Sequence, residues 1–186
     1  SVSRGLGDVY KRQAFEMLYW TGIREGELLA LTPADFNFEK KTLRINKSYQ
    51  RLEGKDVITD PKTPKSNRTI VMPDFLAVEM EDFISSLYGI KDDDRIFTIS
   101  KSYLHHEMDR GAKLAGVKRI RIHGLRHSHI SLLIDLGFSA LAICERVGHE
   151  AVDITYHYAH LFPTVQTDMA AQLETEREAL VNVRKE

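Results

Sequence analysis

Two arginines in this sequence lie in short glycine-containing segments that suit phosphate binding. Arg24 lies in the segment TGIREGE, and Arg126 lies in the segment HGLRH. Glycine lets a ligand or another backbone approach closely, and a planar guanidinium donates paired hydrogen bonds that match phosphate oxygens. Two converging arginines could therefore neutralise a phosphodiester and the additional charge of its transition state. The alternative for each arginine is an ion pair with a neighbouring carboxylate, such as Glu25 or Glu27.

A second set of polar residues lies nearer the C-terminus. His149 lies in the segment VGHE, and nine residues later Tyr158 lies in the segment TYHYAH. A tyrosine hydroxyl has an ordinary pKa of about 10, so at neutral pH it is a poor nucleophile without nearby positive charge and a proton acceptor. Arg24, Arg126 and His123 could supply both. These residue types together predict a tyrosine that attacks a phosphate.

In order and spacing these motifs resemble the catalytic signature of tyrosine recombinases, and the phage and conjugative-transposon integrases in particular. The matching features are the TGxR of Arg24, the HxxR of Arg126, the GH of His149, and a tyrosine directly before Ala-His. Each motif alone is weak, whereas the set is specific. The resemblance runs from about Ala14 to Leu180. It implies an α+β catalytic domain that is mainly α-helical, a helical bundle with a small antiparallel β-sheet near its N-terminal side.

The resemblance also implies a role for each residue of the motifs. Arg24 and Arg126 would clamp the phosphate, and His123 would handle a proton beside Arg126. His149 would donate a hydrogen bond to a phosphate oxygen. Attack by Tyr158 would leave a 3′-phosphotyrosyl bond and a free 5′ hydroxyl, and reversal onto another strand would rejoin DNA without ATP. Because arginines and a general acid supply the charge stabilisation, no metal ion or other cofactor is required.

Two of the implied roles have a competitor close by in the sequence. A lysine from the sheet protonates the leaving 5′ oxygen in the family, and Lys62 in Pro-Lys-Thr matches that context, while Lys65 stands three residues later. Tyr156 stands two residues before Tyr158, but the Tyr-Ala-His context favours Tyr158. The predicted catalytic residues are Arg24, Lys62, His123, Arg126, His149 and Tyr158.

Hydrophobic spacing and turn signals predict the elements that hold these residues. Two short helices with a glycine elbow at Gly22 precede Thr32-Pro33, and about three antiparallel strands follow over residues 36–72. Helical spacing then returns up to the C-terminus. The predicted later helices cover about 75–87, 100–115, 123–136, 139–147 and 164–183.

Composition indicates one soluble domain. The chain has 186 residues, of which 42% are hydrophobic and 28% are charged. It has no run of about 18 apolar residues and no apolar signal region, so we expect a cytoplasmic protein without a membrane contact. The single cysteine, Cys144, lies in an apolar run and is expected to be a buried structural thiol. The eight histidines lack the spacing of metal ligands, so no metal site is predicted.

Charge is unevenly distributed along the chain. The net charge is −1, which does not by itself favour a nucleic-acid binder. Residues 40–72 nevertheless contain nine basic and three acidic residues, and residues 74–94 contain seven acidic residues and one lysine. This segregation predicts either a face for an anionic polymer or a mixed, solvated surface.

The first residues differ in character from the rest. Residues 3–13, SRGLGDVYKRQ, read like the translation of an adaptor used in transposon-based sequencing libraries. We therefore expect a non-native tail over residues 1–13 and the catalytic domain over residues 14–186. In the family an upstream core-binding domain clamps the DNA with this one, and we expect that domain to be missing here.

The expected partner is double-stranded DNA, and the expected function is integration or excision of a mobile element. The resemblance implies a homotetramer on two DNA sites for the full-length enzyme, in which a C-terminal segment passes between neighbours. The helix over about 164–183 is the candidate for that exchange, and packing on its own domain is the alternative. A DNA-binding remnant that does not cut, and a type IB topoisomerase with a similar set of catalytic groups, are the alternative functions.

Overall fold

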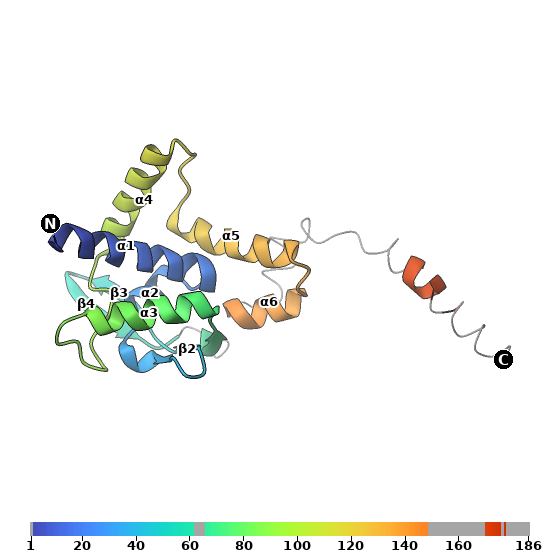
Figure 1. The fold of residues 1–186 in the computed structure, drawn as a ribbon, viewed down its shortest axis with the longest axis horizontal. Helices are drawn as coiled ribbons and strands as arrows, with labels where there is room; N and C mark the ends of the chain where they lie inside the picture. The colour runs from blue at the N-terminus through green and yellow to red at the C-terminus, as the bar shows by residue number, and fades with distance from the viewer. Residues whose placement is uncertain (1, 62–65, 149–169, 176, 178–186) are drawn as a thin grey trace.

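The computed structural model describes residues 2–61, 66–148, 170–175 and 177. The described part is mainly helical, with five short strands near its N-terminal side (Figure 1). Its elements, in chain order, are α1 (Val2–Thr21), α2 (Glu25–Ala30), a 3-10 turn η1 (Pro33–Asp35), β1 (Phe36–Asn37), β2 (Thr42–Ile45), β3 (Ser48–Leu52), β4 (Lys55–Thr59), β5 (Arg68–Val71), α3 (Asp74–Ser86), α4 (Lys101–Ala115), α5 (Ile122–Asp135) and α6 (Ala140–Val147). In addition, residues 170–175 are helical.

The strands form two antiparallel sheets where the sequence predicts one sheet of about three strands. One sheet has the order β1-β2-β5, and the other is the β3-β4 hairpin. The hairpin turns through Glu53 and Gly54, which both have positive φ angles of 49° and 79°, as a two-residue loop with primed geometry requires. After the hairpin the chain returns to β2, where Leu43 pairs with Ile70. The sequence therefore locates the strands within residues 36–72 and predicts that they are antiparallel. The pairing of β5 with β2 depends on tertiary packing.

Two separate groups of apolar side chains stabilise the domain. The larger one joins α1, α2, β2, β5, α3 and α4, and α1 contacts both α3 and α5 (Figure 1). The smaller one lies between α5 and α6 and contains Ile130, Ile134, Ile143 and Val147. Cys144 belongs to this second cluster and is buried, as the sequence predicts. Polar contacts described below connect α6 to the larger part.

Capping residues lie at both ends of α4 and α6, whose bounds agree with the predicted helices over about 100–115 and 139–147. Ser100 accepts a hydrogen bond from the backbone N–H of Tyr103 at 3.1 Å, and Gly116 ends α4 in the left-handed conformation. The Ser139 side chain accepts from Ala142 at 3.3 Å, and Gly148 ends α6 in the same way. A serine N-cap and a left-handed C-terminal glycine satisfy backbone groups that a helix leaves unbonded.

Residues 2–13 form the first half of α1. Tyr10 makes edge-on ring contacts with Phe83 and Phe97 and donates a hydrogen bond to the Ile96 carbonyl at 3.1 Å. Arg12 pairs with Glu79 at 2.8 Å. The adaptor origin of these residues stays a prediction, but in this chain they contribute contacts to the fold. No helix among the described residues is both long and apolar enough to cross a membrane.

Candidate active site

Three of the predicted catalytic residues lie in the described part of the chain. Arg24 immediately precedes α2 as its N-cap, and His123 and Arg126 lie in the first half of α5. The other three, Lys62, His149 and Tyr158, lie outside the described residues. Arg24 and His123 line one cavity of about 320 Å³ between α2, the β3-β4 hairpin and the start of α4. Asp60, two residues before Lys62 in the sequence, also lines this cavity.

Arg24 makes both an ion pair and a contact with the end of α6. Its Nη1 donates to Glu27 Oε1 at 2.8 Å, and its Nη2 donates to the Gly148 carbonyl at 3.1 Å. The backbone N–H of Arg24 donates to the other Glu27 oxygen at 2.8 Å. The side chain remains 36% exposed, so part of the guanidinium faces solvent. The carboxylate pairing that the sequence leaves open therefore exists, with Glu27 as the partner, and it orients the arginine.

Glu27, which the sequence offers only as one possible partner of Arg24, is a buried residue that joins two arginines of the site. Its carboxylate is 5% exposed and accepts hydrogen bonds from Arg68 at 2.9 and 3.1 Å. Burial alone would raise the pKa of Glu27, but the hydrogen bonds and charges of Arg68 and Arg24 outweigh it and lower the pKa below its ordinary 4.5. The spacing of three residues from Arg24 to Glu27 is a helix-capping pattern that could have indicated this role.

Arg126 is a fully buried guanidinium, with only 1% of the residue exposed. Its Nη1 donates to the Gly22 carbonyl and its Nη2 to the Val147 carbonyl, both at 2.5 Å. Arg24 and Arg126, which are far apart in the sequence, therefore contact consecutive carbonyls, those of Gly148 and Val147. The fold brings the two predicted phosphate-binding arginines to one turn.

The His123 imidazole lies next to these charges. Its ring meets the His127 ring edge-on with 4.8 Å between centroids. Partial desolvation, His127, Arg126 and Arg24 each lower the pKa of His123 below its ordinary 6.5. The lowered pKa favours the neutral imidazole, which is the form that accepts a proton as a general base.

The cavity also contains an acidic residue, Glu25. Burial raises its pKa, although His105 and Lys101 act in the opposite direction. Glu25 Oε1 lies 3.4 Å from His105 Nε2 on α4. Glu25 thus faces α4, whereas Glu27 is the carboxylate that binds Arg24.

Five of the nine basic residues in the segment 40–72 pair with carboxylates of the domain. The two alternatives for this segment, a face for an anionic polymer or a mixed surface, stay predictions. The ion pairs are Lys41 with Asp74, Arg44 and Lys47 with Asp35, Arg51 with Asp56, and Arg68 with Glu27.

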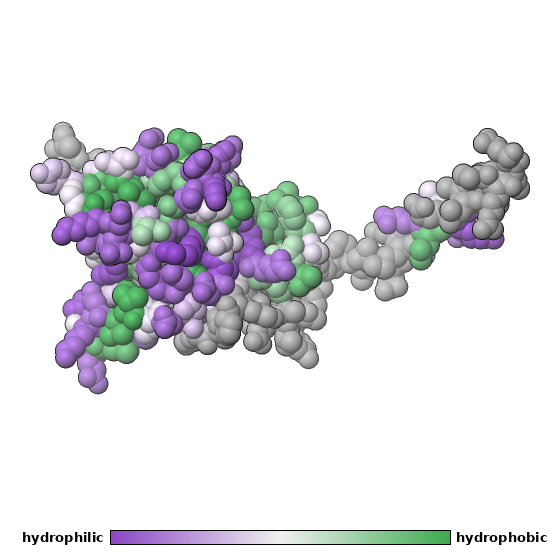
Figure 2. Space-filling model, turned by 90° about the horizontal axis from the view of Figure 1, so that it is seen from below, coloured by the Kyte–Doolittle hydropathy of each residue, from purple (hydrophilic) through white to green (hydrophobic). Residues whose placement is uncertain are grey.

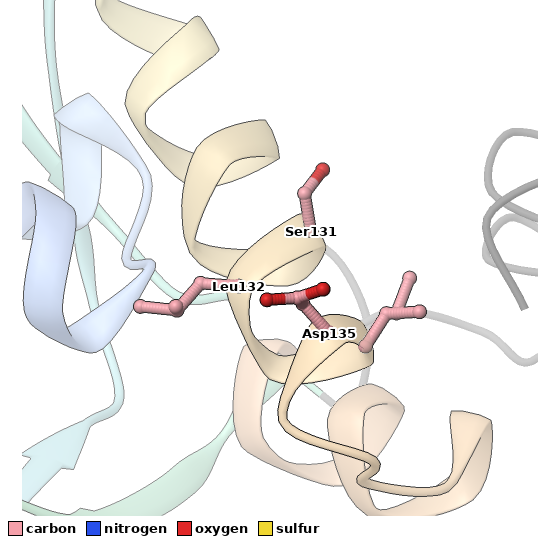
Figure 3. A pocket seen from close by; sticks show the side chains of 4 residues that line it. Ser131, Leu132 and Asp135 are labelled. Carbon is pink, nitrogen blue, oxygen red and sulfur yellow. The ribbon is translucent and has the colours of Figure 1, made fainter.

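A second hollow, of about 370 Å³, lies along the C-terminal half of α5 (Figure 3). Its lining includes Ser131, Leu132, Ile134 and Asp135. None of these is a predicted catalytic residue, and the hollow is mixed in polarity. Among the described residues, no three His, Cys, Asp or Glu side chains are grouped so that they could hold a metal ion.

Gly22 is a position of the site where a side chain would clash with a buried ring. Its φ is +65°, and a Cβ there would lie 2.5 Å from Cδ2 of the buried His129 ring. We expect Gly22→Ala to lower the free energy of unfolding by about 2–4 kcal/mol, because left-handed strain and a steric clash add. Urea denaturation measures this loss.

Gly89→Ala is the matched control for Gly22→Ala. Gly89 also has a positive φ, +70°, but nothing lies within 4 Å of the added Cβ. The control should therefore show only the strain, about 1–2 kcal/mol. Equal losses in the two variants would contradict the close contact between Gly22 and His129.

Comparison with known sequences agrees with this arrangement of motifs. A profile of the phage integrase family matches residues 3–164. The ICEBs1 integrase of Bacillus subtilis (strain 168) is 32% identical over 174 residues, which cover 86% of this chain and 47% of that protein. The integrase of Staphylococcus phage L54a is 30% identical over 179 residues, covering 87% of this chain and 51% of that protein. The chain thus spans about half the length of these curated relatives.

Solved structures show the same fold. The Tn1549 transposon integrase in complex with circular intermediate DNA is similar with a TM-score of 0.73 and 22% identity, over 89% of this chain and 58% of that one. The catalytic domain of bacteriophage HP1 integrase is similar with a TM-score of 0.57 and 20% identity, over 86% and 79%. These likenesses confirm the predicted mainly helical α+β fold. Together with the profile match and the sequence relatives, they show that the chain belongs to the phage integrase family.

Proposed function

We propose that this chain is the catalytic domain of a site-specific DNA recombinase that integrates or excises a mobile element. The observation that carries the proposal is the convergence of Arg24 and Arg126 on consecutive carbonyls of one turn, beside a cavity lined by Arg24 and His123. Two guanidiniums and a neutral imidazole at one place are the groups that phosphoryl transfer to a tyrosine requires.

In the proposed reaction one DNA phosphoryl group is transferred from the 5′ oxygen of its neighbouring nucleotide to a tyrosine oxygen. The Tyr158 oxygen attacks phosphorus and its proton passes to His123, while the bond from phosphorus to the 5′ oxygen breaks. Lys62 gives the leaving 5′ oxygen its proton, and His149 donates a hydrogen bond to a phosphate oxygen. The 3′-phosphotyrosyl bond keeps the phosphodiester energy, so attack by a 5′ hydroxyl rejoins the strand without another energy source.

The proposed substrate is double-stranded DNA, and the proposed compartment is therefore the cytoplasm. The Tn1549 integrase, similar in fold, has been solved in complex with DNA. We further propose a tetramer on two DNA sites for the full-length enzyme. Figure 2 shows apolar surface on the part of the domain where α5 and α6 meet, and we propose that residues 164–183 of a neighbouring copy cover exposed apolar residues there. They are Leu136, Phe138 and Leu141.

A covalent-trapping experiment tests the proposed activity. Residues 1–186 are fused behind the upstream DNA-binding half of a relative, and that relative's core site is supplied as a nicked suicide duplex. The expected result is a protein–DNA adduct on a denaturing gel, with mass spectrometry placing the nucleotide on Tyr158. A DNA adduct on a lysine or a serine, or the absence of any adduct, would contradict the proposal.

The same experiment separates the alternative functions. A folded fusion that binds the duplex without forming an adduct would identify a DNA-binding remnant. Relaxation of supercoiled plasmid without a core site would identify a topoisomerase.

A further inference from the structure

The last turn of α6 accepts hydrogen bonds from three different arginines. The three carbonyls are consecutive in the sequence, and the three donors come from α5, β5 and the residue before α2. The hydrogen bonds are Arg68 Nε to Arg146 O at 2.9 Å, Arg126 Nη2 to Val147 O at 2.5 Å, and Arg24 Nη2 to Gly148 O at 3.1 Å. The position of this turn therefore orients both candidate phosphate-binding arginines, Arg24 and Arg126, through its carbonyl groups.

The Arg146 side chain connects this turn to three other elements. Its Nη1 donates to the Val71 carbonyl of β5 at 3.0 Å, and its Nη2 donates to the Trp20 carbonyl of α1 at 3.1 Å. Its Nε donates to His129 Nε2 on α5 at 3.1 Å. Because the apolar cluster between α5 and α6 is separate from the larger core, these bonds are a main connection between α6 and the body of the domain.

His129 is the side-chain acceptor in this connection. It is 3% exposed, and desolvation, Arg146 and Arg126 lower its pKa to about 4. An arginine Nε–H can only donate, so Nε2 of His129 must be unprotonated to accept. The same ring lies against Gly22, whose carbonyl accepts from Arg126. His129 thus packs against Gly22, one of the two residues whose carbonyls bind Arg126. It also binds Arg146, which belongs to the α6 turn that holds the second carbonyl.

We propose that His129 and Arg146 are positioning residues for phosphate transfer, which hold the α6 turn where it orients Arg24 and Arg126. The inference rests on the proposed function of those two arginines. Neither positioning residue needs to touch DNA. A displacement of about 1 Å in groups that bind the transition state costs up to about a hundredfold in rate, so a modest shift of the turn has a large effect on cleavage.

Two substitutions at His129 separate positioning from simple packing. His129→Gln keeps an oxygen acceptor near the place of Nε2, whereas His129→Leu keeps apolar bulk and removes the acceptor. Arginine Nε–H resonances of the 186-residue chain provide the first readout. We expect the Arg24 and Arg126 resonances to shift or broaden in His129→Leu and to stay near wild type in His129→Gln. Arg110, whose side chain is 54% exposed and pairs with Glu107 within α4, is the control resonance.

Single-turnover adduct formation by the fusion protein provides the second readout. We expect His129→Leu to lower the maximal rate about 10- to 100-fold, with the half-saturating DNA concentration unchanged within about twofold. His129→Gln should recover most of the rate. If His129→Leu does not fold, Arg146→Lys replaces it, because an ammonium on a flexible stem does not reproduce three fixed guanidinium bonds.

Three results would overturn the positioning role. The first is unchanged Arg24 and Arg126 resonances in folded His129→Leu, and the second is a wild-type rate of adduct formation in that variant. The third is an equal loss of rate in His129→Leu and His129→Gln. A wild-type fusion that forms no adduct would defeat the proposed function instead. The arginine resonances would still decide whether His129 orients the two guanidiniums.

Discussion

Tyr158→Phe is expected to abolish the covalent protein–DNA adduct, and Tyr156→Phe is expected to leave it. Phenylalanine keeps the aromatic ring but removes the oxygen that attacks phosphorus, so no phosphotyrosyl bond can form. Tyr156 lacks the Tyr-Ala-His context that favours Tyr158, so we do not expect its hydroxyl to replace the one that is removed.

The chemistry of the described site explains why a tyrosine nucleophile would depend on it. A phenol with an ordinary pKa of about 10 is almost fully protonated at neutral pH. In the proposed reaction Arg24 and Arg126 would supply positive charge, and His123, whose pKa is lowered, would accept the proton. The two arginines would also stabilise the negative charge that develops on the phosphate during attack.

Adduct yield on the nicked duplex measures both tyrosine variants, and a gel-shift assay measures their DNA binding. Equal DNA binding with adduct lost only in Tyr158→Phe would assign the nucleophile. Adduct formation by Tyr158→Phe would place the nucleophile elsewhere. Loss in Tyr156→Phe alone would reverse the assignment.

Glu27→Gln is expected to lower the free energy of unfolding by about 3–5 kcal/mol, the cost of removing one partner of a buried ion pair. Arg68 has a side chain only 5% exposed and would lose its charged partner, while Arg24 would lose the carboxylate that orients it. We therefore expect a lower rate of adduct formation as well, even under conditions where the variant is folded.

The contribution of Glu27 to stability should depend on pH in a definite direction. The folded pKa of Glu27 lies below its ordinary 4.5, so its ionised form stabilises the native state above about pH 4.5. That contribution is lost as the pH falls through the folded pKa. The difference in unfolding free energy between wild type and Glu27→Gln should therefore be largest near pH 7 and decrease at acid pH.

Urea denaturation at several pH values measures this difference. Glu81→Gln on the exposed side of α3 is the matched control, and it should change stability by less than about 0.5 kcal/mol. A Glu27→Gln variant as stable as the control, or a difference that grows at low pH, would contradict the buried pair.

Features with local causes were predictable from the sequence alone. Serine N-caps and left-handed glycines define α4 and α6 through backbone groups within one turn, so Ser100, Gly116, Ser139 and Gly148 could be located without the fold. The glycine elbow at Gly22 was equally visible, because a positive φ of 65° suits glycine. The ordered motifs also sufficed to identify the family.

The tertiary structure decided which groups orient the two arginines. Glu27 and Arg68 are 41 residues apart, and their pairing appears only when β5 joins β2 beside α2. Arg24, Arg126 and Arg146 bind backbone carbonyls, and every residue has a carbonyl, so no residue type in the sequence marks these acceptors. The contact of His129 with Arg146 likewise depends on how α5 and α6 cross. Local free energies determine where helices begin and end, whereas the orientation of the site depends on long-range packing that only the folded chain defines.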